Sequence, residues 1–249
     1  MNLPELLKNE TGLRICDDSV VTKVLESLWP QRDLKYMTPL SSYKIEAFTR
    51  SFAFREIYTS NGIWGIPCKE SIKDIQKYVN PERHRKGRLC PQNTILEVMG
   101  GTGYLSYWLR KYGKLDVVCT DLLSSEEVPS GYFNYHVDIS KKWVSVEPLK
   151  ASDAVLAYPG RSVLASWIPY GGCKGHDELK MLQNMAPGQK LILIGEGQGG
   201  CCASDDFFEM LKTDFKEDGY GRWISPVGIH DNMTFHVKKR NKKCLELPT

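Results

Sequence analysis

Apolar and polar positions alternate regularly between residues 94 and 238. Short apolar runs predict strands, and between them apolar residues recur at the spacing of a helix buried on one face. Pro187-Gly188 is expected to end one helix, and Ser204 is placed to cap the next. Strands that alternate with helices predict an α/β fold with a doubly wound parallel sheet. The expected strands are 94–98, 115–120, 132–137, 153–158, 190–195 and 233–238, and the expected helices are 103–112, 175–186 and 205–213.

Before residue 94 the pattern is helical and irregular. A helix from about Lys69 to Val79 is expected to place Ile72, Ile75 and Val79 on its inner face. We therefore predict three parts. Residues 1–93 form a helical N-terminal extension that also provides a lid, residues 94–240 form a ligand-binding domain, and residues 241–249 form a basic, disordered tail.

The most informative segment runs from Asn93 to Asp121. Glu97 stands near the end of its first apolar run, Gly101 and Gly103 lie in the turn that follows, and Asp121 ends the second run. Glycines in such a turn let the backbone approach a ligand closely. An acid at the end of the second strand can accept both ribose hydroxyls of an adenosine. The segment therefore predicts an adenosine-containing cofactor, either NAD or S-adenosylmethionine.

Two features favour S-adenosylmethionine over NAD. A dinucleotide fingerprint requires Gly-x-Gly-x-x-Gly, and counted from Gly101 its third glycine position holds Ser106. In addition, the carboxylate of Glu97 would repel a pyrophosphate, whereas it would attract the sulfonium and the α-ammonium of S-adenosylmethionine.

Composition narrows the possibilities further. A net charge of +3 over 249 residues is too small to indicate nucleic-acid binding, although the basic run at 238–243 leaves a weak possibility of such contact. The eight cysteines form no Cys-x-x-Cys pair and no His cluster completes a zinc site, so no metal is expected. Reduced thiols predict a cytoplasmic location, and no apolar run is long enough to predict a membrane span.

The segment Glu97–Tyr104 resembles motif I of class I S-adenosylmethionine-dependent methyltransferases, with Met99 where the first glycine is usual. Together with four other segments, it is similar to a poorly characterised group of bacterial and fungal S-adenosylmethionine-binding proteins. The match covers about residues 62–237 and implies a seven-stranded Rossmann-like methyltransferase sheet. The other segments are Gly65-Ile-Pro-Cys68, Trp167-Ile-Pro-Tyr170, Gly195–Ser204 and Gly228-Ile-His-Asp231, and the departures from the group's pattern are Cys68, Met99, Ile168 and Cys202.

The strand-end rule for α/β sheets and the resemblance together suggest roles for individual residues. Glu196, in the glycine-rich loop after the fifth strand, could act as a general base or bind an amine, and His230 could titrate near neutrality. The resemblance implies that Asp138 and Ile139 frame the adenine, although an acid after a strand can instead cap the next helix. The candidate cofactor residues are Glu97, Gly101, Gly103, Tyr104, Asp121, Leu122, Asp138, Ile139 and Trp167; the substrate candidates are Trp64, Pro67, Tyr170 and Asp231; and the catalytic candidates are Glu196, Tyr170 and His230.

Three functions remain open at this point. The first is a methyltransferase that acts on a small molecule or an exposed nitrogen nucleophile. The second is a catalytically silent S-adenosylmethionine-binding protein that acts as a partner or sensor, which the departures at Met99 and Ile168 allow. The third is an NAD-dependent oxidoreductase. Neither the methyl acceptor nor the oligomeric state is predicted.

Overall fold

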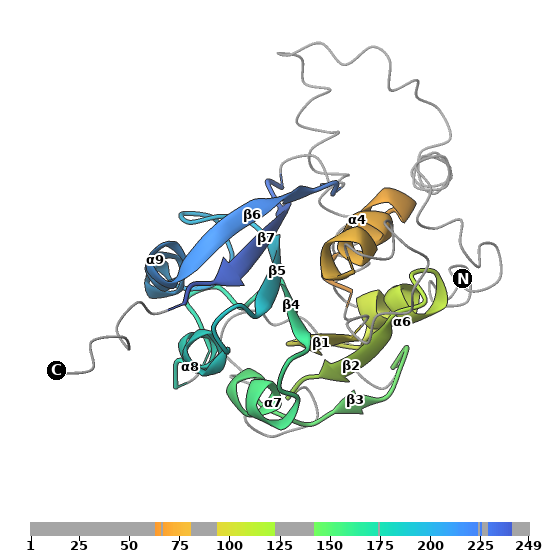
Figure 1. Cartoon of the computed structure of the whole chain (residues 1–249), viewed down its shortest axis with the longest axis horizontal. Helices are drawn as coiled ribbons and strands as arrows, with labels where there is room; N and C mark the ends of the chain where they lie inside the picture. Colours follow the sequence, from red (N-terminus) through yellow and green to blue (C-terminus); the bar gives the residue numbers. More distant parts are fainter. Residues whose placement is uncertain are drawn as a thin grey trace, which may run out of the picture.

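The computed structural model describes residues 63–65, 67–80, 94–122, 142–173, 175–223, 225 and 229–240. In this part of the chain a seven-stranded sheet has the order β3-β2-β1-β4-β5-β7-β6, which confirms the predicted Rossmann-like methyltransferase sheet (Figure 1). The strands β1 to β5 pair in parallel, whereas β7 runs antiparallel to both of its neighbours. The strands are β1 (Thr94–Val98), β2 (Asp116–Thr120), β3 (Val146–Glu147), β4 (Ser162–Ser166), β5 (Lys190–Gly195), β6 (Phe215–Gly221) and β7 (Asn232–Lys238).

Helices cover both faces of the sheet (Figure 1). One apolar cluster joins α4 and α6 to the sheet, and a second joins α7, α8 and α9 to its other face. The predicted inner positions of α4 are confirmed, because Ile72, Ile75 and Val79 are all buried in the first cluster. The helices are α4 (Lys69–Val79), α6 (Tyr104–Lys111), α7 (Ala151–Ala157), α8 (Asp177–Asn184) and α9 (Asp205–Asp214).

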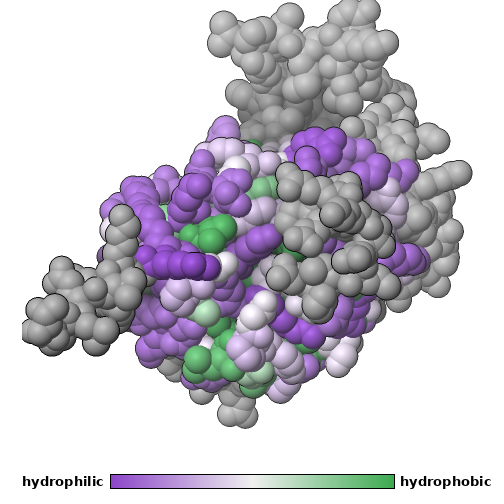
Figure 2. All heavy atoms as spheres, viewed as in Figure 1, coloured by the Kyte–Doolittle hydropathy of each residue, from purple (hydrophilic) through white to green (hydrophobic). Residues whose placement is uncertain are grey.

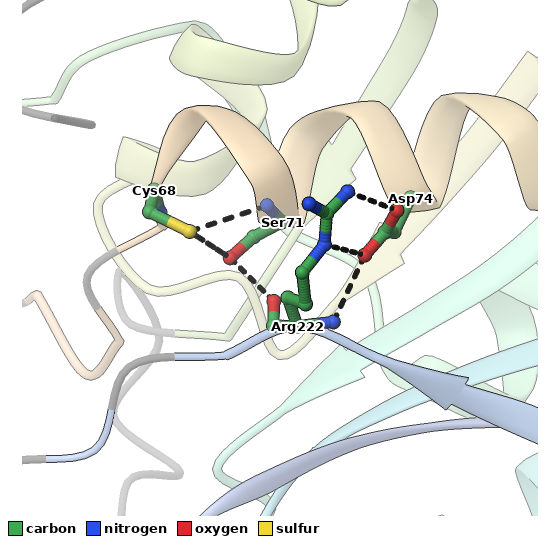
Figure 3. A network of polar contacts seen from close by, with 4 residues as sticks. All are labelled: Cys68, Ser71, Asp74 and Arg222. Carbon is green, nitrogen blue, oxygen red and sulfur yellow. Dashed lines mark hydrogen bonds and ion pairs between the residues drawn. The ribbon is translucent and has the colours of Figure 1, made fainter.

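The departure at Cys68 has a structural role. Cys68 is the N-cap of α4, where its sulfur accepts the backbone N–H of Ser71 at 3.3 Å and the Ser71 hydroxyl accepts the backbone N–H of Cys68 at 3.3 Å. This reciprocal arrangement is a capping box in which a thiol stands where a hydroxyl is usual. The Ser71 hydroxyl also donates to the carbonyl oxygen of Arg222, just after β6, so the cap ties α4 to the sheet (Figure 3).

The fourth strand was predicted in the wrong place. Residues 153–158 were expected to form a strand, but they lie largely in α7, and β4 follows as Ser162–Ser166. A short apolar run does not distinguish a strand from a buried helix. The buried carboxylate of Asp177 decides the outcome here, since it accepts the backbone N–H of Ala151 at 2.7 Å and caps the start of α7.

Two further differences concern the sheet edges. The sheet is parallel except at one edge, where β7 runs antiparallel to β5 and β6. The strand β6 was not predicted, because its exposed residues Lys216 to Asp218 interrupt the apolar pattern. At the other edge, the expected strand at 132–137 lies outside the described residues, and Val146–Glu147 is the segment that pairs with β2. The predicted cap of α9 is confirmed, with the Ser204 hydroxyl accepting the backbone N–H of Phe207 at 3.2 Å.

Candidate functional site

The glycine turn after β1 adopts a left-handed backbone at three positions. The φ angles are 53° at Met99, 57° at Gly101 and 79° at Gly103. A side chain at Gly103 would be unfavourable for two reasons: its φ is left-handed, and its Cβ would lie 2.4 Å from Cγ2 of Val144. Met99 adopts a conformation that glycine tolerates better, which gives a physical reason for the glycine usually found there.

Glu97 lies directly beneath this turn. Its side chain is 1% exposed, and the hydroxyl of Ser106 in α6 donates a hydrogen bond to its Oε2. Burial raises the pKa of Glu97 to about 7, although hydrogen bonds from Ser106 and Cys119 act in the opposite direction. The free protein therefore holds a carboxyl group that is poised to ionise when a cation approaches.

Asp121 meets the same turn from the end of β2. Its Oδ2 accepts the backbone N–H of Gly101 at 2.8 Å, and its own backbone N–H donates to the carbonyl oxygen of Glu147 at 3.0 Å. The structure thus brings together Glu97, Gly101 and Asp121, as the sequence predicted. Leu122 follows and is half-buried.

A small open pocket, with a cavity volume of about 20 Å³, lies at the carboxyl ends of β1 and β4. One wall comes from Ile63, Trp64 and Gly65, which we call the covering segment. Of the predicted residues, Trp64, Glu97 and Tyr104 line the pocket, while Pro67 is buried beside the start of α4. The remaining lining residues are Ile63, Gly65, Met99, Gly100, Leu105 and Ser166.

Several of these lining residues were missed by sequence reasoning. Ser166 obeys the strand-end rule and would have been found had β4 been placed correctly. Ile63 and Gly65 do not follow a strand, so the strand-end rule could not find them. They reach the pocket through the packing of α4 against the sheet. Asp138 and Ile139, the candidate adenine residues, lie outside the described residues.

The aromatic candidates after β4 do not line this pocket. Tyr170 is 59% exposed, and Trp167 is half-buried in a left-handed conformation, with φ of 53° and its backbone N–H donating to the carbonyl oxygen of Ile194. Ile168 is buried in the apolar cluster that includes α7, α8 and α9. Its contribution is therefore to the core, which explains why an aliphatic residue is tolerated there.

Glu196 holds the glycine-rich loop together. Its Oε1 accepts the backbone N–H of His230 at 3.0 Å, and its Oε2 accepts the backbone N–H of Cys201 at 2.7 Å. Burial alone would raise the pKa of Glu196, but these two hydrogen bonds outweigh it, so the pKa is lowered. A lowered pKa makes a carboxylate a weaker base, and this geometry favours a structural contribution over proton removal.

His230 and Asp231 point in different directions, as expected for neighbours on an extended chain. His230 is exposed, whereas Asp231 is 4% exposed and accepts the indole N–H of Trp223 on Oδ2 at 2.8 Å. The two side chains therefore do not act as a pair. Trp223 itself was not singled out from the sequence.

Other kinds of site have little support in the described part of the chain. No group of three or more His, Cys, Asp or Glu side chains there could hold a metal ion. None of its helices combines the length and apolar content needed to cross a bilayer. In the view of Figure 2 the coloured surface is mostly hydrophilic, with small separate apolar patches. The pocket is therefore the strongest candidate site.

Comparisons with known proteins give only remote structural similarities. No protein-family model matches the chain, and none of the curated proteins matches it. Among solved structures, the chain is similar to a Burkholderia thailandensis 1,6-didemethyltoxoflavin-N1-methyltransferase with bound S-adenosylhomocysteine, at 14% identity and a TM-score of 0.43, covering 84% of this chain and 98% of the other. A mutant of MtNAS in complex with S-adenosylmethionine gives 12% identity and a TM-score of 0.44, over 79% and 72% of the two chains.

A third solved structure, an rRNA methylase from Streptococcus thermophilus, gives 14% identity and a TM-score of 0.40, over 68% and 95% of the two chains. Similarities of this size support no conclusion about the activity of this protein. The fold is established instead by the strand order of its own sheet, and the function has to be argued from its own site.

Proposed function

We propose that this protein is an S-adenosylmethionine-dependent methyltransferase that acts on a small molecule or an exposed nitrogen nucleophile. The observation that carries the proposal is the buried carboxyl group of Glu97, which lines a pocket at the glycine turn. No cation among the described residues offsets the raised pKa of this buried acid, and the α-ammonium of the cofactor would provide one. Asp121 lies on the other side of the turn, where a ribose would be held.

The same residues argue against a dinucleotide. The pyrophosphate of NAD would lie over the turn, next to the carboxyl group of Glu97, and would oppose its ionisation. The third glycine position of the dinucleotide fingerprint holds Ser106, whose hydroxyl donates to Glu97. An NAD-dependent oxidoreductase is therefore the weaker alternative.

Each part of the site would have a separate task. Glu97 would bind the methionine ammonium, Gly101 and Gly103 would let the backbone approach the cofactor, and Asp121 would accept its ribose hydroxyls. The cofactor would supply an electrophilic methyl group on its sulfonium. The protein would then orient the nucleophile and exclude water, and the covering segment is placed to assist in both.

The acceptor is the least constrained part of the proposal. Proton removal would fall to Glu196, Tyr170 or His230, of which Glu196 is already held by two backbone N–H groups. That arrangement also supports the second candidate function, a protein that binds S-adenosylmethionine without transferring its methyl group. The left-handed Met99 in the turn supports the same alternative.

Calorimetric titration separates these functions. We expect the protein to bind S-adenosylhomocysteine and not NADH, and to methylate at least one member of a panel of amines, phenols and nitrogen heterocycles. Binding without turnover over the whole panel would favour the silent binder. Binding of NADH but not S-adenosylhomocysteine would contradict both forms of the proposal.

A further inference from the structure

Asp231 is a buried carboxylate that the proposed reaction does not use. It lies immediately before β7, is 4% exposed, and accepts the indole N–H of Trp223 at 2.8 Å. The hydroxyl of Ser225 donates to the carbonyl oxygen of Asp231 at 2.6 Å and fixes its backbone. Burial raises the pKa of Asp231, while the hydrogen bond from the Trp223 indole acts in the opposite direction. Such a group is stable only while its donors stay in place.

Trp223 transmits this constraint to the pocket. A Cβ at Gly65 would lie 2.7 Å from Cζ2 of the Trp223 ring, so the ring lies directly against the backbone of the covering segment. Only glycine at position 65 allows this approach. The covering segment in turn lines the pocket with Glu97 and Tyr104, at the end of the site proposed for the methionine portion of the cofactor.

The residue before Trp223 is held from the opposite side. Arg222 forms a two-pronged ion pair with Asp74 in α4, with both N···O distances at 2.8 Å, and its backbone N–H also donates to Asp74 at 3.0 Å (Figure 3). The pair Arg222-Trp223 is therefore clamped between Asp74 on α4 and Asp231 beside β7. A clamp with one acid on each side leaves the Trp223 ring little freedom to move away from Gly65.

We infer that Asp231 is a positioning residue, which acts through Trp223 to hold the covering segment over the methionine end of the cofactor site. This inference rests on the proposed function. It assigns Asp231 a different task from the substrate contact expected from the sequence, because the carboxylate accepts the indole N–H of Trp223 and Asp231 is not among the residues that line the pocket.

The test compares two ligands that differ only at the end of the site that the covering segment faces. S-Adenosylhomocysteine has an amino-acid portion, whereas 5′-methylthioadenosine has the same adenosine and thioether without it. In Asp231→Ala, which leaves the Trp223 indole N–H without its acceptor, we expect affinity for S-adenosylhomocysteine to fall about fivefold or more, as for a lost hydrogen bond to a charged group. Affinity for 5′-methylthioadenosine is expected to change less than about twofold.

Trp223→Phe provides a second route to the same result. Phenylalanine keeps an aromatic ring at this position but has no N–H for Asp231 to accept. If the two residues act as a unit, the double variant should lose no more affinity than the single variant that loses more. Asp218→Ala, the same change on the exposed surface of β6, is the matched control and should leave both affinities unchanged.

The outcomes separate this inference from the proposed function. If the unaltered protein binds neither ligand, the proposed function fails. If it binds both, and Asp231→Ala or Trp223→Phe weakens them equally, Asp231 has only a general structural role and the inference is overturned. Thermal unfolding of each variant shows that the comparison is made on folded protein, and losses that simply add in the double variant would also overturn the inference.

Discussion

The titration of Glu97 gives the sharpest prediction about the cofactor site. The pKa of Glu97 in the free protein is about 7, because the carboxyl group is buried. If the ionised form binds the ammonium of the cofactor, protonation competes with binding. Affinity for S-adenosylhomocysteine should therefore increase as the pH rises through 7 and then level off.

The size of the effect follows from the pKa. The apparent dissociation constant is proportional to one plus the ratio of protonated to ionised Glu97. For a pKa of about 7, this sum is about 11 at pH 6 and about 1.3 at pH 7.5. The expected gain between these two pH values is about eightfold, or about 1.3 kcal/mol. At pH 6.5 about three-quarters of the free protein holds this proton, so binding should release roughly 0.8 proton per site.

Calorimetry in buffers with different ionisation enthalpies measures both the affinity and the released proton. The ligand control is 5′-methylthioadenosine, which has no ammonium and should bind with little dependence on pH. The protein control is Glu97→Gln, which keeps an acceptor for the Ser106 hydroxyl but does not titrate. Equal affinity of the unaltered protein at pH 6 and pH 7.5, or the same pH dependence in Glu97→Gln, would refute the reasoning.

The same pKa has a consequence for stability. The ordinary pKa of this carboxyl group is 4.5 and the folded value is about 7, so the folded state binds the proton more tightly than the unfolded state does. The cofactor-free protein should therefore lose stability as the pH rises from about 4.5 to about 7, and no further loss from this group is expected above that range. Glu97→Gln avoids the loss and should be more stable than the unaltered protein at pH 8 by up to about 3 kcal/mol.

Three other substitutions test the surrounding structure. Gly103→Ala should destabilise the fold by about 2–4 kcal/mol in urea unfolding, because its backbone would be strained and its Cβ would lie 2.4 Å from Val144. Adding Val144→Ala should restore part of this stability, and the absence of any recovery would contradict the predicted steric overlap. Asp177→Ala should cost about 2–3 kcal/mol, because its buried carboxylate caps α7, while an effect near zero would show that the cap is dispensable. Asp121→Ala should weaken S-adenosylhomocysteine binding by about 1–3 kcal/mol in calorimetry, and unchanged affinity would place the ribose elsewhere.

Local pattern and short-range chemistry were sufficient for much of the fold. The boundaries and inner face of α4 followed from its helical spacing, and the strand, turn, helix and strand around the glycine turn followed from residues close together in the chain. The juxtaposition of Glu97, Gly101 and Asp121 was also predictable. Parallel neighbouring strands bring their carboxyl ends to one edge, so two residues 24 positions apart in sequence must meet there.

Other features depend on contacts between distant segments. The apolar run in α7 could equally have formed a strand until Asp177, on another helix, capped it. The edge strand β6 exists because β7 pairs with it, although its own exposed charges hide the pattern. Neither outcome is encoded in the spacing of the residues concerned.

The sequence by itself determined the glycine turn, its two acids and the positions of β1, β2, β5 and β7, since each depends on neighbours along the chain. Only the tertiary structure decided which residues close the site. The covering segment reaches the pocket because α4 packs on the sheet, and Trp223 is placed against Gly65 by carboxylates on α4 and beside β7. The physical reason is that burial is a property of the assembled fold. Surrounding segments, some of them far away in sequence, enclose Glu97 and raise its pKa. Enclosure likewise leaves Asp231 dependent on its indole donor.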